Sequence, residues 1–221
     1  MDYDESIMKS IHTITVLKFV AFFFILIGLF ISSAMATEEP DFSLILKDEN
    51  IEIREYAQKI IAQVEVSGEF DQASSKGFKL LADFIFGNNI TDEGSEKISM
   101  TSPVEMYSLE NNIQITSPVM SEEGSGVWSV NFTMPKKFTL ESLPKPANTA
   151  VEIIQVPKEK YVVIVFSGLV TESSYNEKAE LLDNYLKAHN LETIGPVKVA
   201  RYNPPWTLPF FRRNELMVKI N

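Results

Sequence analysis

Two stretches of the chain share one pattern of apolar and polar positions. Ile51–Gly68 reads IEIREYAQKIIAQVEVSG, and Val151–Gly168 reads VEIIQVPKEKYVVIVFSG. In each stretch apolar residues alternate with polar ones, a polar break follows near the middle, and a denser apolar run comes after it. This pattern predicts two strands joined by a turn, at residues 57–59 in the first stretch and 157–159 in the second. Because the stretches match without a gap, they predict an internal repeat.

A helical spacing of apolar residues follows each predicted strand pair. The first pattern runs from Phe70 to Phe86, and the Gly-Asn-Asn sequence at 87–89 is typical of a helix end. The apolar residues on one face of this helix are Ala73, Phe78, Leu81, Ala82 and Ile85. The second pattern runs from Ser174 to His189, and Ser173 or Ser174 is expected to cap it. Its apolar face consists of Tyr175, Ala179, Leu182 and Leu186.

Strand patterns return after each predicted helix. They cover residues 97–107, 114–120, 127–134, 197–202 and 215–220. The sequence therefore predicts an α+β domain of two similar halves, each in the order strands–helix–strands, related by a pseudo-twofold axis. Each half leaves an apolar sheet face that it cannot bury alone, so we expect the halves to pack into one domain. The proline-rich stretch 143–146 is the expected connector.

The N-terminal segment carries an apolar run without this alternation. Phe19–Ile31 is uncharged but shorter than the about 20 residues that a membrane-spanning helix needs. Lys18 precedes the run and Ala34-Met35-Ala36 follows it, which is typical of a signal peptide cleaved after Ala36. We therefore expect a signal peptide at 1–36 and a folded domain at 37–221.

This interpretation places the domain in the secreted or periplasmic space. The alternative is an uncleaved N-terminal membrane anchor with the domain outside the cytoplasm. Asp2, Asp4 and Glu5 fit the start of a signal peptide poorly, and translation from Met8 would remove them.

Composition excludes several kinds of site. The chain has 221 residues, 45% of them hydrophobic and 23% charged, which is typical of a folded globular protein. It contains no cysteine, so disulfides, cysteine zinc sites, iron–sulfur clusters and covalently attached haem are excluded. The two histidines, His12 and His189, are too few for a multi-histidine metal centre. The net charge of −10 disfavours a nucleic-acid partner.

An ordered series of short motifs resembles the SOUL haem-binding protein family. The motifs lie at residues 52–56, 77–78, 86–89, 100–104, 128–135, 143–146, 166–168, 201–206 and 212–215. The resemblance runs from about Asn50 to the C-terminus. It implies a distorted open β-barrel made from a duplicated strand–helix–strand unit and flanked by two helices, a fold also similar to gyrase-inhibitor-like ligand-binding domains. It further implies noncovalent binding of haem b or another tetrapyrrole.

The resemblance also implies where the ligand binds. A tetrapyrrole such as haem is a flat apolar ring with carboxylates, so its site needs an apolar slot with cations at the rim. In the family one side of the first helix helps to form the groove, which implies contacts by Phe78, Ala82 and Ile85. Lys76 and Lys79 flank Phe78 and could pair with the carboxylates. The same apolar stripe is also typical of core packing, and the same lysines of solvated surface.

The sequence assigns no axial ligand to an iron atom. His189 is interpreted as a solvated histidine at a helix C-terminus, where the helix dipole favours it. One branch of the family uses a histidine at a position that corresponds to Glu55 here. Arg212 and Arg213 are interpreted as a structural network with Glu215 and nearby carbonyl groups, in preference to an anion clamp.

The expected function is that of an exported tetrapyrrole-binding protein that holds its ligand for scavenging, buffering or transfer. No Gly-x-Ser-x-Gly elbow and no phosphate-binding loop occurs in the sequence, and we expect no enzymatic activity. The first alternative is a binding module for another amphiphilic small molecule. The second, which the motifs support less, is an enzyme that acts on such a ligand.

Overall fold

We analysed a computed structural model of the chain that describes residues 37–109 and 126–221. Thr37–Asn221 forms one compact unit, separate from residues 1–36. The predicted signal peptide and the predicted strand at 114–120 therefore lie outside the described residues. No helix of the described part is both long enough and apolar enough to cross a membrane.

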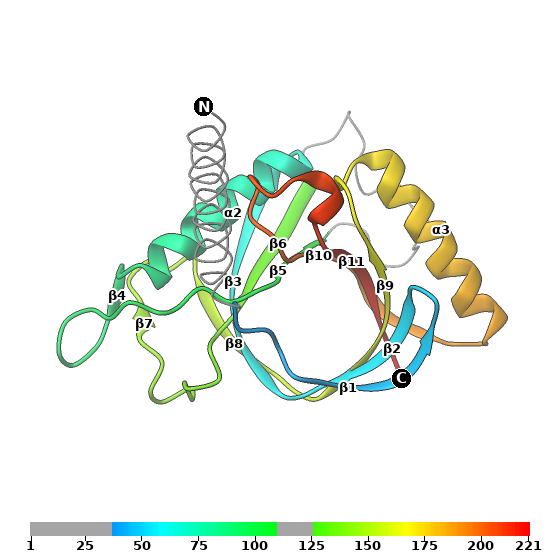
Figure 1. The fold of residues 1–221 in the computed structure, drawn as a ribbon. Helices are drawn as coiled ribbons and strands as arrows, with labels where there is room; N and C mark the ends of the chain where they lie inside the picture. The colour runs from blue at the N-terminus through cyan, green and yellow to red at the C-terminus, as the bar shows by residue number, and fades with distance from the viewer. Residues whose placement is uncertain (1–36, 110–125) are drawn as a thin grey trace, which may run out of the picture. The chain divides into compact units, whose positions relative to one another are not determined.

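The described residues form a large antiparallel sheet of nine strands (Figure 1). Its strands are β1 (Phe42–Asp48), β2 (Ile51–Tyr56), β3 (Lys59–Gly68), β5 (Val104–Ser108), β6 (Gly126–Thr133), β8 (Glu152–Val156), β9 (Glu159–Phe166), β10 (Thr193–Arg201) and β11 (Asn214–Ile220). Two short strands, β4 (Asn89–Ile90) and β7 (Lys145–Pro146), pair separately. The second of these lies within the predicted proline-rich connector at 143–146.

The order of strands in the sheet confirms the predicted repeat. After the edge strand β1, the order is β2-β9-β11-β10-β5-β6-β3-β8. The first repeat contributes β2, β3, β5 and β6, and the second contributes β8, β9, β10 and β11 in the same roles. The corresponding pairs are β2 and β8, β3 and β9, β5 and β10, and β6 and β11. When the members of each pair are exchanged, the order of strands is the same but reversed. A pseudo-twofold axis therefore passes between β5 and β10.

A long bent ribbon joins the two halves. β2 leads into β3 through Ala57 and Gln58, and β8 leads into β9 through residues 157–158, as the turn pattern predicts. One side of the ribbon is β2 followed by β3, and the other side is β8 followed by β9. β2 pairs with β9 and β3 pairs with β8, so each side of the ribbon extends through both halves of the sheet. The sheet curves strongly (Figure 1). Its order nevertheless ends at β1 and β8, so the large antiparallel sheet with two helices is confirmed, and closure into a barrel is not.

Both predicted helices lie on the outer side of the curved sheet (Figure 1). Helix α2 (Phe70–Ile85) packs on β3 and β6, and helix α3 (Glu172–Ala188) packs on β9 and β11. The main hydrophobic core lies between these helices and the sheet and includes Leu81, Phe132, Ile164, Leu182 and Leu216. A smaller apolar cluster around Val163 and Met217 lies on the opposite, inner face of the sheet.

Three details differ from the sequence predictions. Thr171, not Ser173 or Ser174, caps α3, because its hydroxyl accepts a hydrogen bond from the Ser174 amide at 3.2 Å. The predicted strand at 97–107 begins only at Val104, since the amide of Ile98 donates to the end of α2 at Ile85 and that of Ser102 donates to Glu38. Strand β1 was not predicted, because its apolar residues do not alternate with polar ones and all of them are exposed.

Candidate functional site

Helix α2 approaches strand β6 closely at Gly77. A Cβ atom added to this glycine would lie 2.5 Å from a methyl carbon of Val130, far inside van der Waals contact. The absent side chain lets the helix lie directly on the sheet at this point. The next residue, Phe78, is thereby placed at the edge of the helix–sheet contact, where its ring meets that of Phe132 edge-on with centroids 5.4 Å apart.

The five sequence-predicted ligand contacts divide into two groups. Phe78 is 40% exposed, and Lys76 and Lys79 on either side of it are exposed. Ala82 and Ile85 lie on the side of the helix that faces the sheet, and Ile85 is fully buried in the core. Lys76, Phe78 and Lys79 are accessible to a ligand without any movement of the helix. Ala82 and Ile85 instead pack the helix against the sheet.

The outer face of α2 has the chemistry that a flat apolar dianion needs. The half-exposed ring of Phe78 is held from behind by Phe132 and offers an apolar surface. Neither Lys76 nor Lys79 forms an ion pair with any other described residue, so both ammonium groups are open to an incoming carboxylate. These residues therefore offer an apolar surface flanked by two cations.

The inner face of the sheet carries a buried ionic network instead. The Arg54 guanidinium donates to Glu52 at 2.7 Å and to Glu215 at 3.0 Å, and Glu215 also accepts from Tyr202 and Arg213. Burial raises the pKa of Tyr56 to about 12, and the charge of Glu215 adds to the effect. The acceptors and donors satisfy one another, so this network holds strands together and leaves no free acid or base.

A second network surrounds Glu105, which is fully buried on β5. Its carboxylate pairs with Lys59 of β3 at 2.5 Å and with Lys198 of β10 at 3.5 Å. Burial by itself would raise the pKa of Glu105, but the two ammonium groups outweigh it and lower the pKa to about 2. The alternation in IEIREY indicated one polar face on β2, whereas no pattern in the sequence indicated that this face is buried or that Glu105 forms a network.

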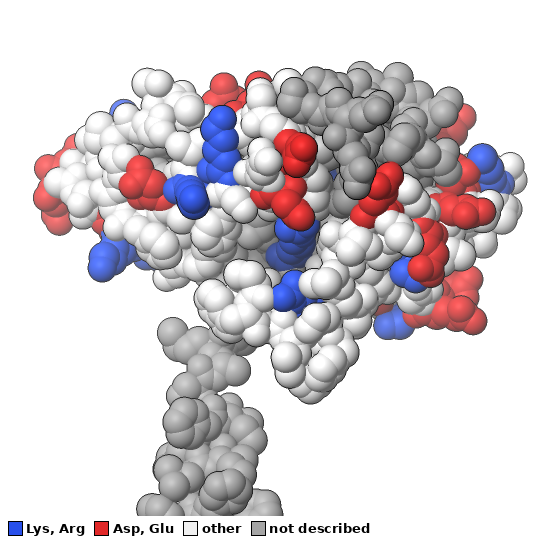
Figure 2. Space-filling view, turned by 90° about the horizontal axis from the view of Figure 1, so that it is seen from above, with Lys and Arg blue, Asp and Glu red and all other residues white. Residues whose placement is uncertain are grey.

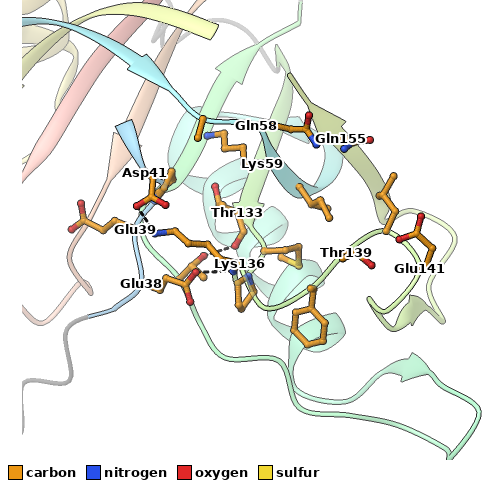
Figure 3. A pocket seen from close by; sticks show the side chains of 18 residues that line it. Glu38, Glu39, Asp41, Gln58, Lys59, Thr133, Lys136, Thr139, Glu141 and Gln155 are labelled. Atoms are coloured by element: carbon orange, nitrogen blue, oxygen red, sulfur yellow. Dashed lines mark hydrogen bonds and ion pairs between the residues drawn. The ribbon is translucent and has the colours of Figure 1, made fainter. Parts of the chain in front are cut away.

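A cavity of about 340 Å³ lies between residues 38–41 and the turn between β2 and β3 (Figure 3). This volume is at the lower end of the range for small-molecule sites. Its apolar lining includes Ile60, Met134 and Phe138. Thr133 also lines it, and its buried hydroxyl has no hydrogen-bond partner among the described residues. The lining thus includes one buried hydroxyl group without a described partner, beside a small apolar patch.

The charges around this cavity are mainly acidic. Four carboxylates line it, from Glu38, Glu39, Asp41 and Glu141. The two lysines of the lining are already engaged, because Lys136 pairs with Asp41 and Lys59 pairs with Glu105, both at 2.5 Å. In Figure 3 the acidic groups lie on both sides of the cavity. A ligand with carboxylates would meet repulsion here.

The remaining sequence-predicted residues are structural in their contacts. His189 follows the last turn of α3 and is exposed, with its ring stacked on Tyr185. Arg213 donates to Glu215, and Arg212 donates to the carbonyl groups of Thr207 and Pro205, which confirms the predicted network. Within residues 37–109 and 126–221, no cluster of three or more histidine or carboxylate side chains could hold a metal ion.

Comparison with protein families gives one match across the whole described domain. A family model described as "SOUL heme-binding protein" matches residues 37–219. A search of curated proteins gives no significant match.

Comparison with solved structures gives several similar folds. The C-terminal domain of EcmrR matches with a TM-score of 0.54 at 8% identity, over 77% of this chain and 96% of that chain. A hydrolase from Listeria innocua matches with a TM-score of 0.51 at 9% identity, over 85% of this chain and 94% of that one. At these identities the likeness concerns the fold alone.

Proposed function

Since the chain belongs to the SOUL heme-binding protein family, we propose that it binds haem or another tetrapyrrole noncovalently on the outer face of helix α2. The observation that carries the location is the half-exposed ring of Phe78 between Lys76 and Lys79, neither of which has an acidic partner among the described residues. The ring of the ligand lies on Phe78, and its carboxylates reach Lys76 and Lys79.

Two physical terms contribute to binding in this arrangement. Covering the exposed part of the Phe78 ring removes apolar surface from water, and complete burial of such a side chain contributes about 1.5–3 kcal/mol. Each lysine–carboxylate contact adds a charge-assisted hydrogen bond. Phe132 keeps the Phe78 ring in place, so little side-chain freedom is lost when the ligand binds.

Charge favours the helix face over the cavity as the tetrapyrrole site. The cavity lining has four carboxylates and two lysines, and both lysines already pair with acids. The helix face presents Lys76 and Lys79 without such partners among the described residues. A dianionic ligand is therefore attracted to the helix and repelled from the cavity.

The proposal extends to the ligand's identity and the protein's role. We propose haem b as the tetrapyrrole, held without chemical conversion for scavenging, buffering or transfer. The N-terminal apolar run supports export, with the domain acting in the secreted or periplasmic space or outside the membrane that anchors it.

A second candidate is a small amphiphile bound in the cavity. The buried, unpartnered hydroxyl of Thr133 favours it, because an unsatisfied buried polar group is costly and a ligand could satisfy it. The acidic lining would select a neutral or cationic molecule.

Titration with hemin tests the main proposal. The Soret absorbance should saturate for the wild-type protein, and Phe78→Asp should weaken binding at least about tenfold, because it removes the apolar platform and adds a repelling charge. Leu181→Asp is the matched control: Leu181 is 43% exposed on α3 and should leave affinity unchanged. Lys76→Glu with Lys79→Glu should weaken binding in a salt-dependent way.

Three outcomes would contradict the proposal. Unchanged affinity in folded Phe78→Asp would remove the helix face as the site. Loss of binding in Thr133→Tyr, which fills the cavity, with Phe78→Asp unaffected, would move the site to the cavity. Steady loss of the Soret band with release of a ring-opened product would show an enzyme in place of a carrier.

A further inference from the structure

The loop before strand β11 presents a group of large apolar side chains to solvent. Trp206 is 82% exposed, Leu208 56%, Phe210 66% and Phe211 70%. No other short segment among the described residues exposes so much apolar surface. Residues 203–211 contain no charged side chain. We call residues 204–211 the aromatic loop; it includes the short 3-10 helix η1 (Pro209–Phe211).

The backbone of the aromatic loop is hydrogen-bonded within the protein. The Arg212 guanidinium donates to the carbonyl groups of Pro205 and Thr207, the latter at 2.7 Å. Amides of Thr207, Phe211 and Arg212 donate to the carbonyl groups of residues 204, 208 and 209. The three prolines, at 204, 205 and 209, have no amide hydrogen. These bonds and the prolines lower the number of backbone groups that would be left unsatisfied when the loop leaves water.

Basic side chains lie beside the loop. Arg201 and Arg212 are close enough that the charge of Arg212 contributes to lowering the pKa of Arg201, after burial as the main cause. Figure 2, which looks down on this side of the domain, shows a projection of uncharged surface with basic side chains next to it. Arg201 pairs with Asp71 at 3.3 Å, whereas Arg212 has no carboxylate partner among the described residues and supplies the positive charge beside the loop.

We propose that the aromatic loop inserts into the interfacial layer of a lipid bilayer that contains anionic phospholipids. Tryptophan at this depth places its ring between headgroups and acyl chains, while Leu208, Phe210 and Phe211 enter the apolar layer. The arginines beside the loop attract the phosphates, Arg212 above all, because it has no acidic partner among the described residues. A bilayer suits the loop because the loop offers an apolar surface whose backbone is partly hydrogen-bonded within the protein. Its only side chains able to hydrogen-bond are those of Trp206 and Thr207.

The two tryptophans provide a local measurement in the full-length protein. Trp128 is buried, and its indole donates to the Gly68 carbonyl at 2.9 Å, so its environment stays constant. Trp206 should shift its emission to shorter wavelength on vesicles of phosphatidylethanolamine and phosphatidylglycerol. Phospholipids brominated on the acyl chain should quench it. Trp206→Phe should abolish the shift and the quenching.

Matched variants separate loop insertion from other attachment. Phe210→Ser with Phe211→Ser should weaken the vesicle-dependent response of Trp206 by at least about tenfold for each phenylalanine. Leu181→Ser, an equally apolar exposed site on α3, should leave the response unchanged. If the protein sediments with vesicles while Trp206 stays open to iodide and unquenched, the N-terminal run binds lipid and the proposal is wrong. Equal binding to pure phosphatidylcholine would overturn the role given to the arginines.

Discussion

Arg54 and Glu215 are the most deeply buried ion pair of the described residues. Their side chains are 2% and 0% exposed, and the facing atoms are 3.0 Å apart. Burial by itself would lower the pKa of Arg54, but the charge of Glu215 and further partners raise it above its usual range. Removing charges from water is costly, so the pair is stable only because each member keeps several partners.

Replacing one member should therefore destabilise the fold. Arg54→Met leaves the Glu215 carboxylate buried with fewer donors, and we expect a loss of about 3 kcal/mol in unfolding free energy. Urea unfolding followed by circular dichroism measures it. Lys158→Met, which breaks the exposed pair with Glu55, should cost at most about 1 kcal/mol. Equal effects of the two changes would contradict the role of burial.

Periodicity identified the stripe on α2 but not the depth of each residue in it. Phe78 and Ile85 are seven residues apart and lie on one predicted face, yet one is half-exposed and the other is buried. Depth depends on how the helix tilts over the sheet, and that contact is set by Gly77 and Val130. Such pairs between distant segments leave no local signal in the sequence.

Helix α2 and strand β6 fit together through a missing side chain. The space that a Cβ at Gly77 would need is filled by Val130. Glycine is unfavourable inside a helix by about 1 kcal/mol relative to alanine, so close packing here offsets a local cost.

The substitution Gly77→Ala tests the balance between helix propensity and close packing at this position. We expect a destabilisation of about 1–3 kcal/mol from overpacking, despite the better helix propensity of alanine. In the Val130→Ala background the same change should be neutral or stabilising, because the space is then free. Ser75→Ala, on the exposed side of the helix, serves as the control. Additive effects of Gly77→Ala and Val130→Ala in urea unfolding would contradict the contact.

Helices and strands whose apolar residues recur with a regular spacing were predictable from the sequence. Elements that depend on pairing with other segments of the chain were not. The repeated strands and both helices follow from alternation and helical spacing. Strand β1 pairs along one edge with β2 and exposes all its residues, so its apolar run has no alternation to detect. The cap of α3 lies at Thr171 because the Ser174 side chain turns back to bond the Thr171 amide at 2.8 Å.

At the scale of the whole domain, ionic groups of the inner face join the two repeats. Glu105 and Lys59 belong to the first repeat and Lys198 to the second. Arg54 and Glu215 likewise come from different repeats. The halves therefore meet through the shared ribbon and through charge pairs on the inner face.

This arrangement predicts acid sensitivity. The pKa of Glu105 falls from its ordinary value of 4.5 to about 2 in the folded protein. A depressed carboxyl pKa stabilises the fold above the unfolded value, so this stability should be lost as the pH falls from 4.5 toward 2. One pKa unit corresponds to about 1.4 kcal/mol, so the loss is about 3 kcal/mol.

Urea unfolding at a series of pH values measures this effect. Glu105→Gln should be less stable near neutral pH and should lose part of the acid dependence. Glu177→Gln, which replaces an exposed carboxylate on α3, should keep the wild-type profile. An unchanged profile in Glu105→Gln would contradict the assignment.

The pseudo-twofold order of the sheet also bears on stoichiometry. A perfect repeat would give two equivalent helix faces and hence two equivalent ligand sites. The faces have diverged. α2 presents Phe78 between Lys76 and Lys79, whereas near the exposed Leu181 of α3 the lysine Lys178 already pairs with Glu177 and Glu180 adds a further acid. The first face offers a dianion two lysines without described partners, and the second offers one lysine that is already paired. The duplicated fold should therefore take up one tetrapyrrole per chain, with a single class of site in the binding isotherm.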